Sequence, residues 1–229
     1  MTEDEAKAIN EFLNTLADKQ KAGSKKKPNP NHPKSGAKID IHPLRNESDI
    51  KTMLRYLSGN PRNCLLFVMG INTGIRITDL LPLKVADLRY LEVGQVHQII
   101  ENKTGKKNQI VINKSVRNAL DKFIQEKKPA DRDFLFQSAK KDKHGNYQPI
   151  KIEHVNKMIK NWTRAIKLDP SKYGARTLRK TWGYQQRVKF GAGWELIAKR
   201  YNHSSPAVTR RYLGFESKEV NEILMNDIC

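Results

Sequence analysis

The sequence predicts a mainly helical domain with a small antiparallel β-sheet, an α+β fold. Apolar residues recur at helical spacing through most of the chain after residue 41. Between residues 88 and 112 the spacing changes to the alternation that is typical of half-buried strands. Because a chain of 229 residues can bury one good core and a small appendage, we expect one compact domain with a short extension.

The chain divides by composition into three segments. Residues 1–21 are predicted to form a helix, because Thr2 and Glu5 have the spacing of a capping box and the apolar residues that follow share one face. Residues 22–40 hold three prolines and a lysine run and cannot build a core, so they are expected to be a basic linker, either an arm along a polyanion or a soluble tether. Residues 41–229 form the predicted compact domain.

Helical periodicity predicts most elements of that domain. Ser48 is the expected cap of its first helix, and Gly74 the expected end of a second helix that is apolar nearly all round. Thr78 and Asp79 are expected to open a short third helix. The longer helices are predicted at residues 48–57, 63–73, 115–126, 152–166, 180–189, 194–201 and 217–227.

Strand periodicity predicts a hairpin in the first half of the domain. Residues 96–101 and 109–112 alternate as strands do, and the turn between them passes through residues 104–106. A third strand is expected near residues 89–93. Residues 127–147 are expected to be mostly loop.

The charge of the chain points to a polyphosphate partner. The formal net charge is +19 and the pI is near 9.9, and each Lys or Arg that neutralises a phosphate releases a counterion and adds affinity. A membrane is the competing anionic surface, but the sequence has no long amphipathic basic helix and no apolar span. A nucleic acid is therefore the expected partner.

Cysteine and histidine usage indicates a reducing compartment and predicts no metal site. Cys64 and Cys229 lie far apart in the sequence, which argues against a disulfide framework. The acidic N-terminus is unlike a signal peptide. The six histidines and two cysteines show no metal-ligand spacing.

The segment 200–214 carries the strongest chemical signal. Pro206 suits the first turn of a short helix behind a Ser205 cap, and this helix carries Tyr212 nine residues after His203. Two arginines precede the tyrosine directly, so it is a candidate nucleophile toward a phosphodiester. Taken alone, a tyrosine in such a segment is better explained as a core tyrosine beside a solvated basic face.

Four segments in this order resemble the tyrosine recombinases, the phage integrase family. They match its first arginine motif, its hairpin lysine, its second arginine box and its last box. The segments are residues 73–80 (TGIRITDL), 102–106 (NKTGK), 178–181 (LRKT) and 203–212. The resemblance covers roughly residues 41–229 and implies the catalytic domain of these DNA breaking and rejoining enzymes.

The resemblance implies site-specific DNA recombination without metal or cofactor, as in integrases of phages and mobile elements. Arg76 and Arg179 are expected to clamp the scissile phosphate, since guanidinium is planar, permanently charged and bidentate. Lys103 is expected to protonate the leaving 5′ oxygen, and His203 to donate a hydrogen bond to the phosphate. Tyr212 is expected to attack phosphorus and form a 3′-phosphotyrosyl bond.

Two further assignments leave alternatives open. Asp79, three residues after Arg76, is expected to orient that guanidinium, and a simple helix-start role is compatible with this. Lys103 matches the hairpin lysine best, although Lys106 and Lys107 occupy the same turn.

The sequence departs from the family pattern at Arg176. The family has a histidine three residues before the second arginine, and an arginine cannot accept a proton there. A catalytically impaired DNA-binding relative is therefore the first alternative, and a type IB topoisomerase is the second. A basic RNA-binding protein is less favoured, because aromatic RNA-binding strands and a zinc knuckle are missing from the sequence.

The resemblance also implies partners and a location. Double-stranded DNA and a homotetramer on DNA are expected, with the predicted helix 217–227 docking on a neighbouring protomer or on its own domain. About 40 residues precede the domain, too few for the family's helical core-binding domain, so a fragment or a short member is expected. The implied location is the cytoplasm, on the nucleoid, of a bacterial or phage-carrying host.

Overall fold

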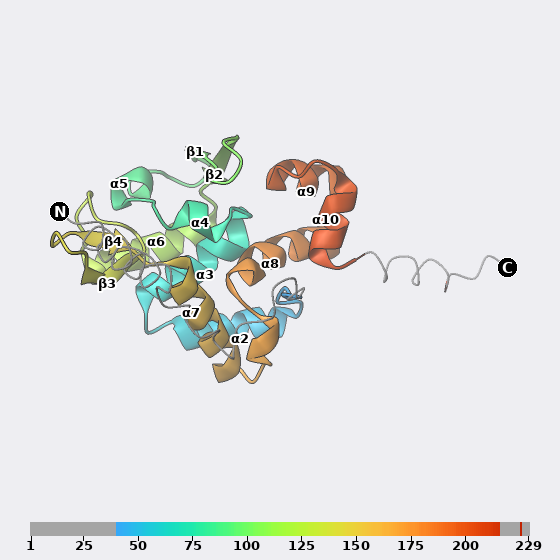
Figure 1. Cartoon of the computed structure of the whole chain (residues 1–229), viewed down its shortest axis with the longest axis horizontal. Helices are drawn as coiled ribbons and strands as arrows, with labels where there is room; N and C mark the ends of the chain where they lie inside the picture. Colours follow the sequence, from blue (N-terminus) through green and yellow to red (C-terminus); the bar gives the residue numbers. More distant parts are fainter. Residues whose placement is uncertain (1–39, 216–224, 226–229) are drawn as a thin grey trace, which may run out of the picture. The chain divides into compact units, whose positions relative to one another are not determined.

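A computed structural model describes residues 40–215 and Met225, and it confirms the predicted fold class (Figure 1). Helices form most of the described part, and two separate two-stranded antiparallel hairpins complete it. The helices are α2 (Glu47–Leu57), α3 (Pro61–Thr73), α4 (Ile77–Leu80), α5 (Val85–Leu88), α6 (Lys114–Lys127), α7 (Ile152–Ala165), α8 (Ala175–Val188), α9 (Trp194–Tyr201) and α10 (Pro206–Leu213), with a 3₁₀ turn at Pro170–Lys172. The strands are β1 (Val96–Ile100), β2 (Lys107–Val111), β3 (Gln137–Lys141) and β4 (Tyr147–Pro149).

The expected helix at residues 1–21, the linker at 22–40 and the helix at 217–227 fall outside the described residues, apart from Asp40 and Met225. Within the described part, no helix is long and apolar enough to cross a membrane.

Helix α3 is the centre of the core. It packs against α6 on one side and α8 on another, and apolar side chains are buried around most of its circumference. Removing each of these from water contributes about 1.5–3 kcal/mol. Gly70 allows the close approach of α8, because a Cβ at this position would lie 2.5 Å from a methyl carbon of Leu178. The buried apolar residues of α3 are Leu65, Leu66, Phe67, Val68 and Met69.

A smaller apolar cluster lies at the carboxyl end of the domain. Helices α9 and α10 pack against each other and against α8 (Figure 1). Trp194, Ile197, Tyr201 and Leu213 form the buried part of this cluster. The last two helices are therefore attached to the main core chiefly through α8.

The β1–β2 hairpin has the register that its alternating pattern requires. Val96 pairs with Val111, and Ile100 pairs with Lys107. The side chain of Ile110 points inward and is completely buried. This hairpin confirms the predicted strand pair, with β2 beginning two residues earlier than predicted.

Three helix starts differ from prediction. Asn46, and not Ser48, precedes the first turn of α2. Asn60 caps α3, accepting from the Asn63 N–H at 3.1 Å, so the predicted stop signal at residues 59–61 also begins the next helix. Helix α8 begins at Ala175, five residues before the predicted start. Its first turns carry buried polar side chains such as Thr177, which hid the apolar period.

The predicted third strand was wrong, and the predicted loop at residues 127–147 contains a hairpin that was not predicted. Residues 89–93 form no strand, because the preceding helix α5 is held by hydrogen bonds from Val85 N–H to Asp133 O and from Ala86 N–H to Asp131 O. Residues 137–149 form the β3–β4 hairpin, most of which lies within the predicted loop. Its strands are polar on both faces and therefore lack the alternation on which the prediction depended.

Candidate active site

The turn that precedes α4 positions Arg76. Helix α3 ends at Gly74 with φ +66, a left-handed conformation that favours glycine. A Cβ on Gly74 would also lie 2.8 Å from the ring of Trp182, so packing requires glycine as well. Two residues later the side chain of Arg76 is only 21% exposed, and its Nη1 lies 2.5 Å from an oxygen of Glu101.

Glu101 is completely buried at the end of the β1–β2 hairpin. Its carboxylate accepts hydrogen bonds from the Thr104 hydroxyl at 2.6 Å and the Asn108 amide at 2.8 Å, besides its ion pair with Arg76. Burial opposes ionisation, but these hydrogen bonds outweigh it and lower the pKa of Glu101 to about 2. A charged Glu101 therefore joins the Arg76 turn to the hairpin turn.

Asp79 on α4 supports the same hairpin. It is buried, and one of its oxygens accepts from the backbone N–H of Asn102 at 3.0 Å. Burial raises the pKa of this carboxyl group, and the nearby charge of Glu101 adds to the effect. Among the described residues the ion pair of Arg76 is with Glu101, while Asp79 bonds to the residue before Lys103. An orienting role of Asp79 toward Arg76 stays a prediction.

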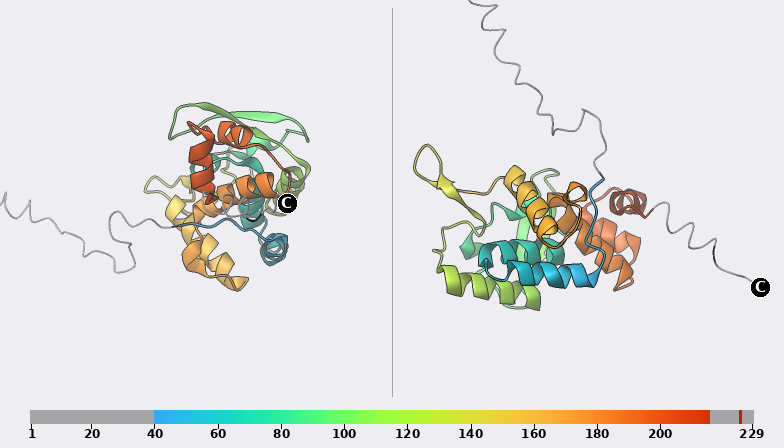
Figure 2. Two further views of the ribbon diagram at one scale, coloured as in Figure 1. Left: turned by 90° about the vertical axis from the view of Figure 1, so that its right-hand side faces the viewer. Right: turned by 90° about the horizontal axis from the view of Figure 1, so that it is seen from below.

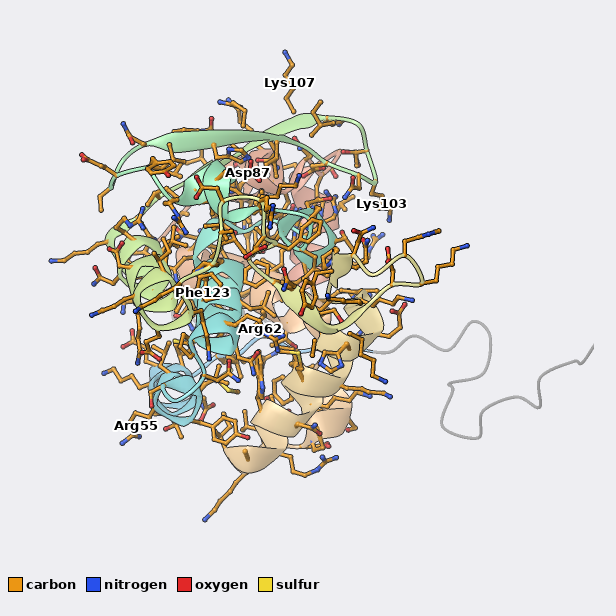
Figure 3. All side chains as sticks on the ribbon, turned by 90° about the vertical axis from the view of Figure 1, so that its left-hand side faces the viewer. Arg55, Arg62, Asp87, Lys103, Lys107 and Phe123 are labelled. Carbon is orange, nitrogen blue, oxygen red and sulfur yellow. The ribbon has the colours of Figure 1, made fainter. Side chains whose placement is uncertain are left out.

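Lys103 lies in the turn at the end of the hairpin and projects away from the body of the domain (Figure 3). The turn is closed by the carbonyl of Glu101, which accepts from the N–H groups of Thr104 and Gly105. The side chain of Lys103 is exposed, and no ion pair within residues 40–215 involves it. In the described part of the chain, Lys103 therefore forms no ion pair with the other candidate residues.

Arg179 lies on the inner face of α8, with 4% of its surface exposed. Its guanidinium covers the ring of Tyr201 at 4.4 Å, and Nη2 donates to the carbonyl of Tyr201 at 2.8 Å. Burial lowers the pKa of Arg179, and the charge of Arg76 lowers it further. Its Nη1 is buried without a hydrogen-bond partner in the described part of the chain, which leaves one donor for an anion.

His203 and Tyr212 come together at the junction of α9 and α10. Asn202 ends α9 in a left-handed conformation, with φ +53, and turns the chain toward Ser205, which caps α10 as predicted. The two aromatic rings are 5.3 Å apart and meet edge to face. Nδ1 of His203 is 2.9 Å from the hydroxyl of Thr209, on the same short helix as Tyr212.

The imidazole of His203 is neutral at neutral pH. Burial lowers its pKa to about 4, and the positive charges of Arg179 and Arg76 contribute to the shift. These two arginines are thus close enough to repel a proton on His203. The three predicted phosphate ligands therefore share one region and do not lie on separate surfaces.

The ring of Tyr212 is partly buried among three side chains. Tyr201 is 5.6 Å away by ring centroids, His203 is 5.3 Å away, and the ammonium of Lys180 lies over the ring at 5.2 Å from its centre. Tyr212 thus contacts α8 and α9 as well as its own helix.

Electrostatics around the phenol act in opposite directions. Burial raises the pKa of Tyr212, whereas Arg179, Arg176 and Arg76 lower it. Arg176 is exposed on α8, three residues before Arg179, and its charge is one of the three that lower the pKa of the phenol. All three arginines favour the phenolate that a nucleophilic attack requires.

Lys180 is one of the residues that the sequence analysis overlooked. It is 7% exposed, and its ammonium lies 3.8 Å from a carboxylate oxygen of Asp40. Burial lowers the pKa of Lys180, Asp40 opposes the shift, and Arg176 adds to it. The sequence could have indicated Lys180 through its position four residues after Arg176, because residues four apart lie on the same face of a helix.

Among the described residues, no group of three His, Cys, Asp or Glu side chains is arranged to hold a metal ion. What converges instead is a set of cations around a tyrosine. Such a set can bind a phosphate diester and stabilise negative charge on its oxygens.

Comparison with known proteins agrees with this geometry. The family model of the phage integrase family matches residues 46–219. The chain belongs to the phage integrase family. A Bacillus subtilis (strain 168) protein named "Probable integrase/recombinase YoeC" is 33% identical over 180 residues, which cover 77% of this chain and 91% of that protein. The present chain is also 24% identical over 194 residues to "Tyrosine recombinase XerD" of Rickettsia bellii (strain RML369-C), and the match covers 78% of this chain and 61% of XerD.

Solved structures show the same fold at low identity. XerA recombinase superposes with a TM-score of 0.61 at 18% identity, covering 84% of this chain and 65% of XerA. A lambda integrase dimer bound to a core site superposes with a TM-score of 0.53 at 18% identity, covering 80% of this chain and 62% of that one. The chain thus spans less than two thirds of the length of these solved recombinases.

Proposed function

We propose that this recombinase breaks and rejoins DNA at specific sites through a covalent bond between Tyr212 and a 3′ phosphate. The proposal depends chiefly on Nη1 of Arg179, a buried donor with no partner in the described residues. A buried donor left unsatisfied costs about 1–3 kcal/mol, and a phosphate oxygen would satisfy it. The same guanidinium is close enough to Tyr212 to lower the pKa of its phenol.

In the proposed reaction the phenol oxygen of Tyr212 attacks phosphorus, the bond to the 5′ oxygen breaks, and Lys103 gives a proton to the leaving oxygen. Arg76 and Arg179 stabilise the charge that develops on the non-bridging oxygens, and His203 donates a hydrogen bond to one of them. The phosphotyrosyl bond conserves the energy of the phosphodiester. A 5′ hydroxyl of another strand can therefore reverse the reaction without ATP.

The phenol must lose its proton during the attack. Arg176 occupies the position of the family histidine and cannot accept that proton. We infer that the local positive charge drives ionisation instead, because Arg179, Arg176 and Arg76 all lower the pKa of Tyr212. The enzyme is accordingly expected to cleave faster as the pH rises toward the pKa of the phenol.

The first experiment looks for the covalent intermediate. A pool of duplexes of randomised sequence, each with a nick just 3′ of the position to be cleaved, is incubated with the protein in EDTA and then denatured. We expect a protein–DNA adduct on denaturing gels, absent with Tyr212→Phe and present with the control Tyr90→Phe, whose tyrosine is 70% exposed on the surface. An adduct that persists in Tyr212→Phe, or no adduct from any duplex, contradicts the proposal.

The alternative that this chain is a catalytically impaired relative is tested with the variant Arg176→His in the same assay. An imidazole can accept the phenolic proton, so the variant should form adduct faster at neutral pH. A topoisomerase-like activity would relax supercoiled plasmid without joining strands of two different duplexes. The strand-exchange products of the nicked pool distinguish the two activities.

We further propose that the partner is double-stranded DNA and that the active form is a homotetramer, with residues 217–227 docking on a neighbouring protomer. The support comes from the matched structures. XerH recombinase is bound to a palindromic difH substrate, the Tn1549 transposon integrase is bound to circular intermediate DNA, and the lambda integrase is a dimer on a core site. Because a similar protein comes from a bacterium, we propose that the reaction takes place in a bacterial cytoplasm, on the nucleoid. By analogy with the matched recombinases, we propose that it integrates or excises a phage or mobile element.

A further inference from the structure

The β3–β4 hairpin projects from the helical body (Figure 2, right). Residues 137–149 carry three lysines, Lys140, Lys141 and Lys143, and one acidic residue, Asp142. All three lysine side chains are exposed. None of the ion pairs formed within residues 40–215 involves any of them, so their charges are available to a partner.

The single carboxylate at the tip is used by the turn itself. Asp142 accepts from the backbone N–H groups of His144 at 2.8 Å and Asn146 at 2.9 Å, and from the amide of Gln148 at 2.9 Å. The backbone bond from Asn146 is the main reason that the pKa of Asp142 is low. The carboxylate therefore fixes the shape of the turn from which the lysines extend, instead of pairing with them.

The base of the hairpin is anchored in the core. Phe136 just before β3 is completely buried, and Ile150 just after β4 is nearly so. The N–H of Ile150 donates to the carbonyl of Phe136 at 2.8 Å, and Arg62 on α3 donates to the carbonyl of Gln137 at 2.9 Å. A cationic tip on an anchored two-stranded arm loses little conformational entropy when it binds.

The hairpin points to the same side of the domain as Lys103 (Figure 3). We propose that Lys140, Lys141 and Lys143 bind the phosphate backbone of the DNA duplex that flanks the cleaved bond. This inference rests on the proposed function, because it takes the side of Lys103 as the side that faces DNA. Contacts of this kind add affinity and fix orientation but carry no sequence information.

Charge favours DNA over a protein as the binding partner of the hairpin tip. A second copy of this chain carries a net charge of +19 and would on average repel a lysine tip, whereas a duplex presents a dense row of negative charges. The large exposed ring of the hairpin, Tyr147, has the Lys141 ammonium over it at 4.9 Å, which disfavours an apolar contact with a protein partner there.

The experiment compares the triple variant Lys140→Gln, Lys141→Gln, Lys143→Gln with the wild-type protein. Binding to a 40-base-pair duplex of arbitrary sequence is measured by fluorescence anisotropy from 50 to 300 mM NaCl. The slope of log affinity against log salt is negative, and each lost phosphate contact should make it less steep by about 0.9. The slope of the triple variant should therefore be less steep than that of the wild-type protein by roughly 2–3. Its affinity should fall at least tenfold at the lowest salt concentration.

A charge-matched control places the same three changes on the opposite side of the domain. Lys51 on α2, Lys114 and Lys127 on α6 are also exposed, and these helices lie away from the side of Lys103 in Figure 3. Their substitution by glutamine should change the slope by less than 1. Equal losses from the two triple variants would contradict the proposal, because they would report net charge and not the hairpin.

Two further outcomes separate this inference from the proposed function. If the triple variant has the wild-type salt slope but no longer forms multi-protomer complexes on DNA, the tip binds protein and the inference is wrong. At saturating protein, the triple variant should still form the covalent adduct, because the tip lies outside the reacting groups. Failure of the wild-type protein to form any adduct would overturn the proposed function, while a changed slope in the triple variant would still support a hairpin–DNA contact.

Discussion

Glu101 connects two parts of the proposed active site. Its buried carboxylate holds the guanidinium of Arg76 and also accepts hydrogen bonds from Thr104 in the Lys103 turn and from Asn108 on β2. Removing one partner of a buried ion pair leaves the other charge uncompensated, at a cost of about 3–5 kcal/mol. Glu101 therefore acts through Arg76 and the hairpin, as a positioning residue.

His203 makes stability depend on pH in a defined window. Its pKa in the folded protein is about 4, below the ordinary value of 6.5, so the unfolded chain binds the proton first as the pH falls. Acid therefore favours the unfolded state. The contribution of a neutral His203 is complete above pH 6.5 and declines as the pH drops toward 4.

We expect the free energy of unfolding to fall by roughly 1–2 kcal/mol more in the wild-type protein than in His203→Asn between pH 7 and pH 5. Asparagine is chosen because its amide can still bond to Thr209. Urea denaturation followed by tryptophan fluorescence measures the difference. Glu101 does not interfere, since its own window runs from pH 4.5 down to about 2. Parallel pH curves for the two proteins would show that His203 is not held neutral by its surroundings.

At the scale of elements, Arg200 joins three segments that carry proposed site residues. From the last turn of α9 it donates to the carbonyl of Thr73 at the end of α3, through Nε at 2.8 Å and through Nη2. Its Nη1 donates to the Asn108 side chain and the Gln109 carbonyl on β2, both at 2.7 Å. Burial lowers the pKa of Arg200 to about 10, and it stays charged at neutral pH.

Arg200→Ala is expected to release the hairpin from α9. The carbonyls of Thr73 and Gln109 would lose charged donors, each of which is worth about 1.5–3 kcal/mol. We predict faster amide exchange in β1 and β2 and a roughly tenfold slower adduct formation at saturating DNA, with DNA affinity changed much less. Hydrogen exchange and single-turnover cleavage measure the two effects.

Lys199→Ala is the matched control, because Lys199 is exposed on the same helix. Arg200→Lys should restore part of the cleavage rate by keeping one charged donor. If Arg200→Ala cleaves as fast as the wild-type protein while exchange in the hairpin increases, the position of the hairpin does not limit the reaction.

At the scale of the whole molecule, a chain with a net charge of +19 repels its own copies. DNA neutralises this charge, so assembly should depend on DNA. We expect the free protein to sediment as a monomer and the complex with a nicked duplex to contain more than one protomer. A chain shortened to residues 1–215 should bind the duplex as a monomer. A strict monomer of the full chain on DNA would contradict the proposed oligomer.

The fold was largely predictable where a local pattern carried it. Helix α3 is buried nearly all round, and α10 follows a Ser205 cap and Pro206, so both left direct signals in neighbouring residues. The β3–β4 hairpin was missed because its strands have no buried face to impose alternation. The start of α8 was missed because its buried turn uses threonine and charged residues.

The candidate site was predictable as a list of residues but not as an arrangement. Arg76, Arg179, His203 and Tyr212 were recognised from short motifs, and the structure brings them into one cationic region. Glu101, Lys180 and Arg200 were not recognised. Glu101 and Arg200 act on partners on other elements, which no spacing rule identifies. Lys180 could have been found only through its helical spacing from Arg176.

The sequence by itself determined the helical class, the strand pair, the positive charge and the residue types that chemistry on a phosphate requires, because these depend on composition and on contacts within a few residues. Only the tertiary structure decided which carboxylate pairs with Arg76, which donor of Arg179 stays unpaired and which lysine covers Tyr212. Those outcomes depend on how α8, α9 and the β1–β2 hairpin pack together, where a charge that is solvated in the open chain must find a partner or remain available for a ligand.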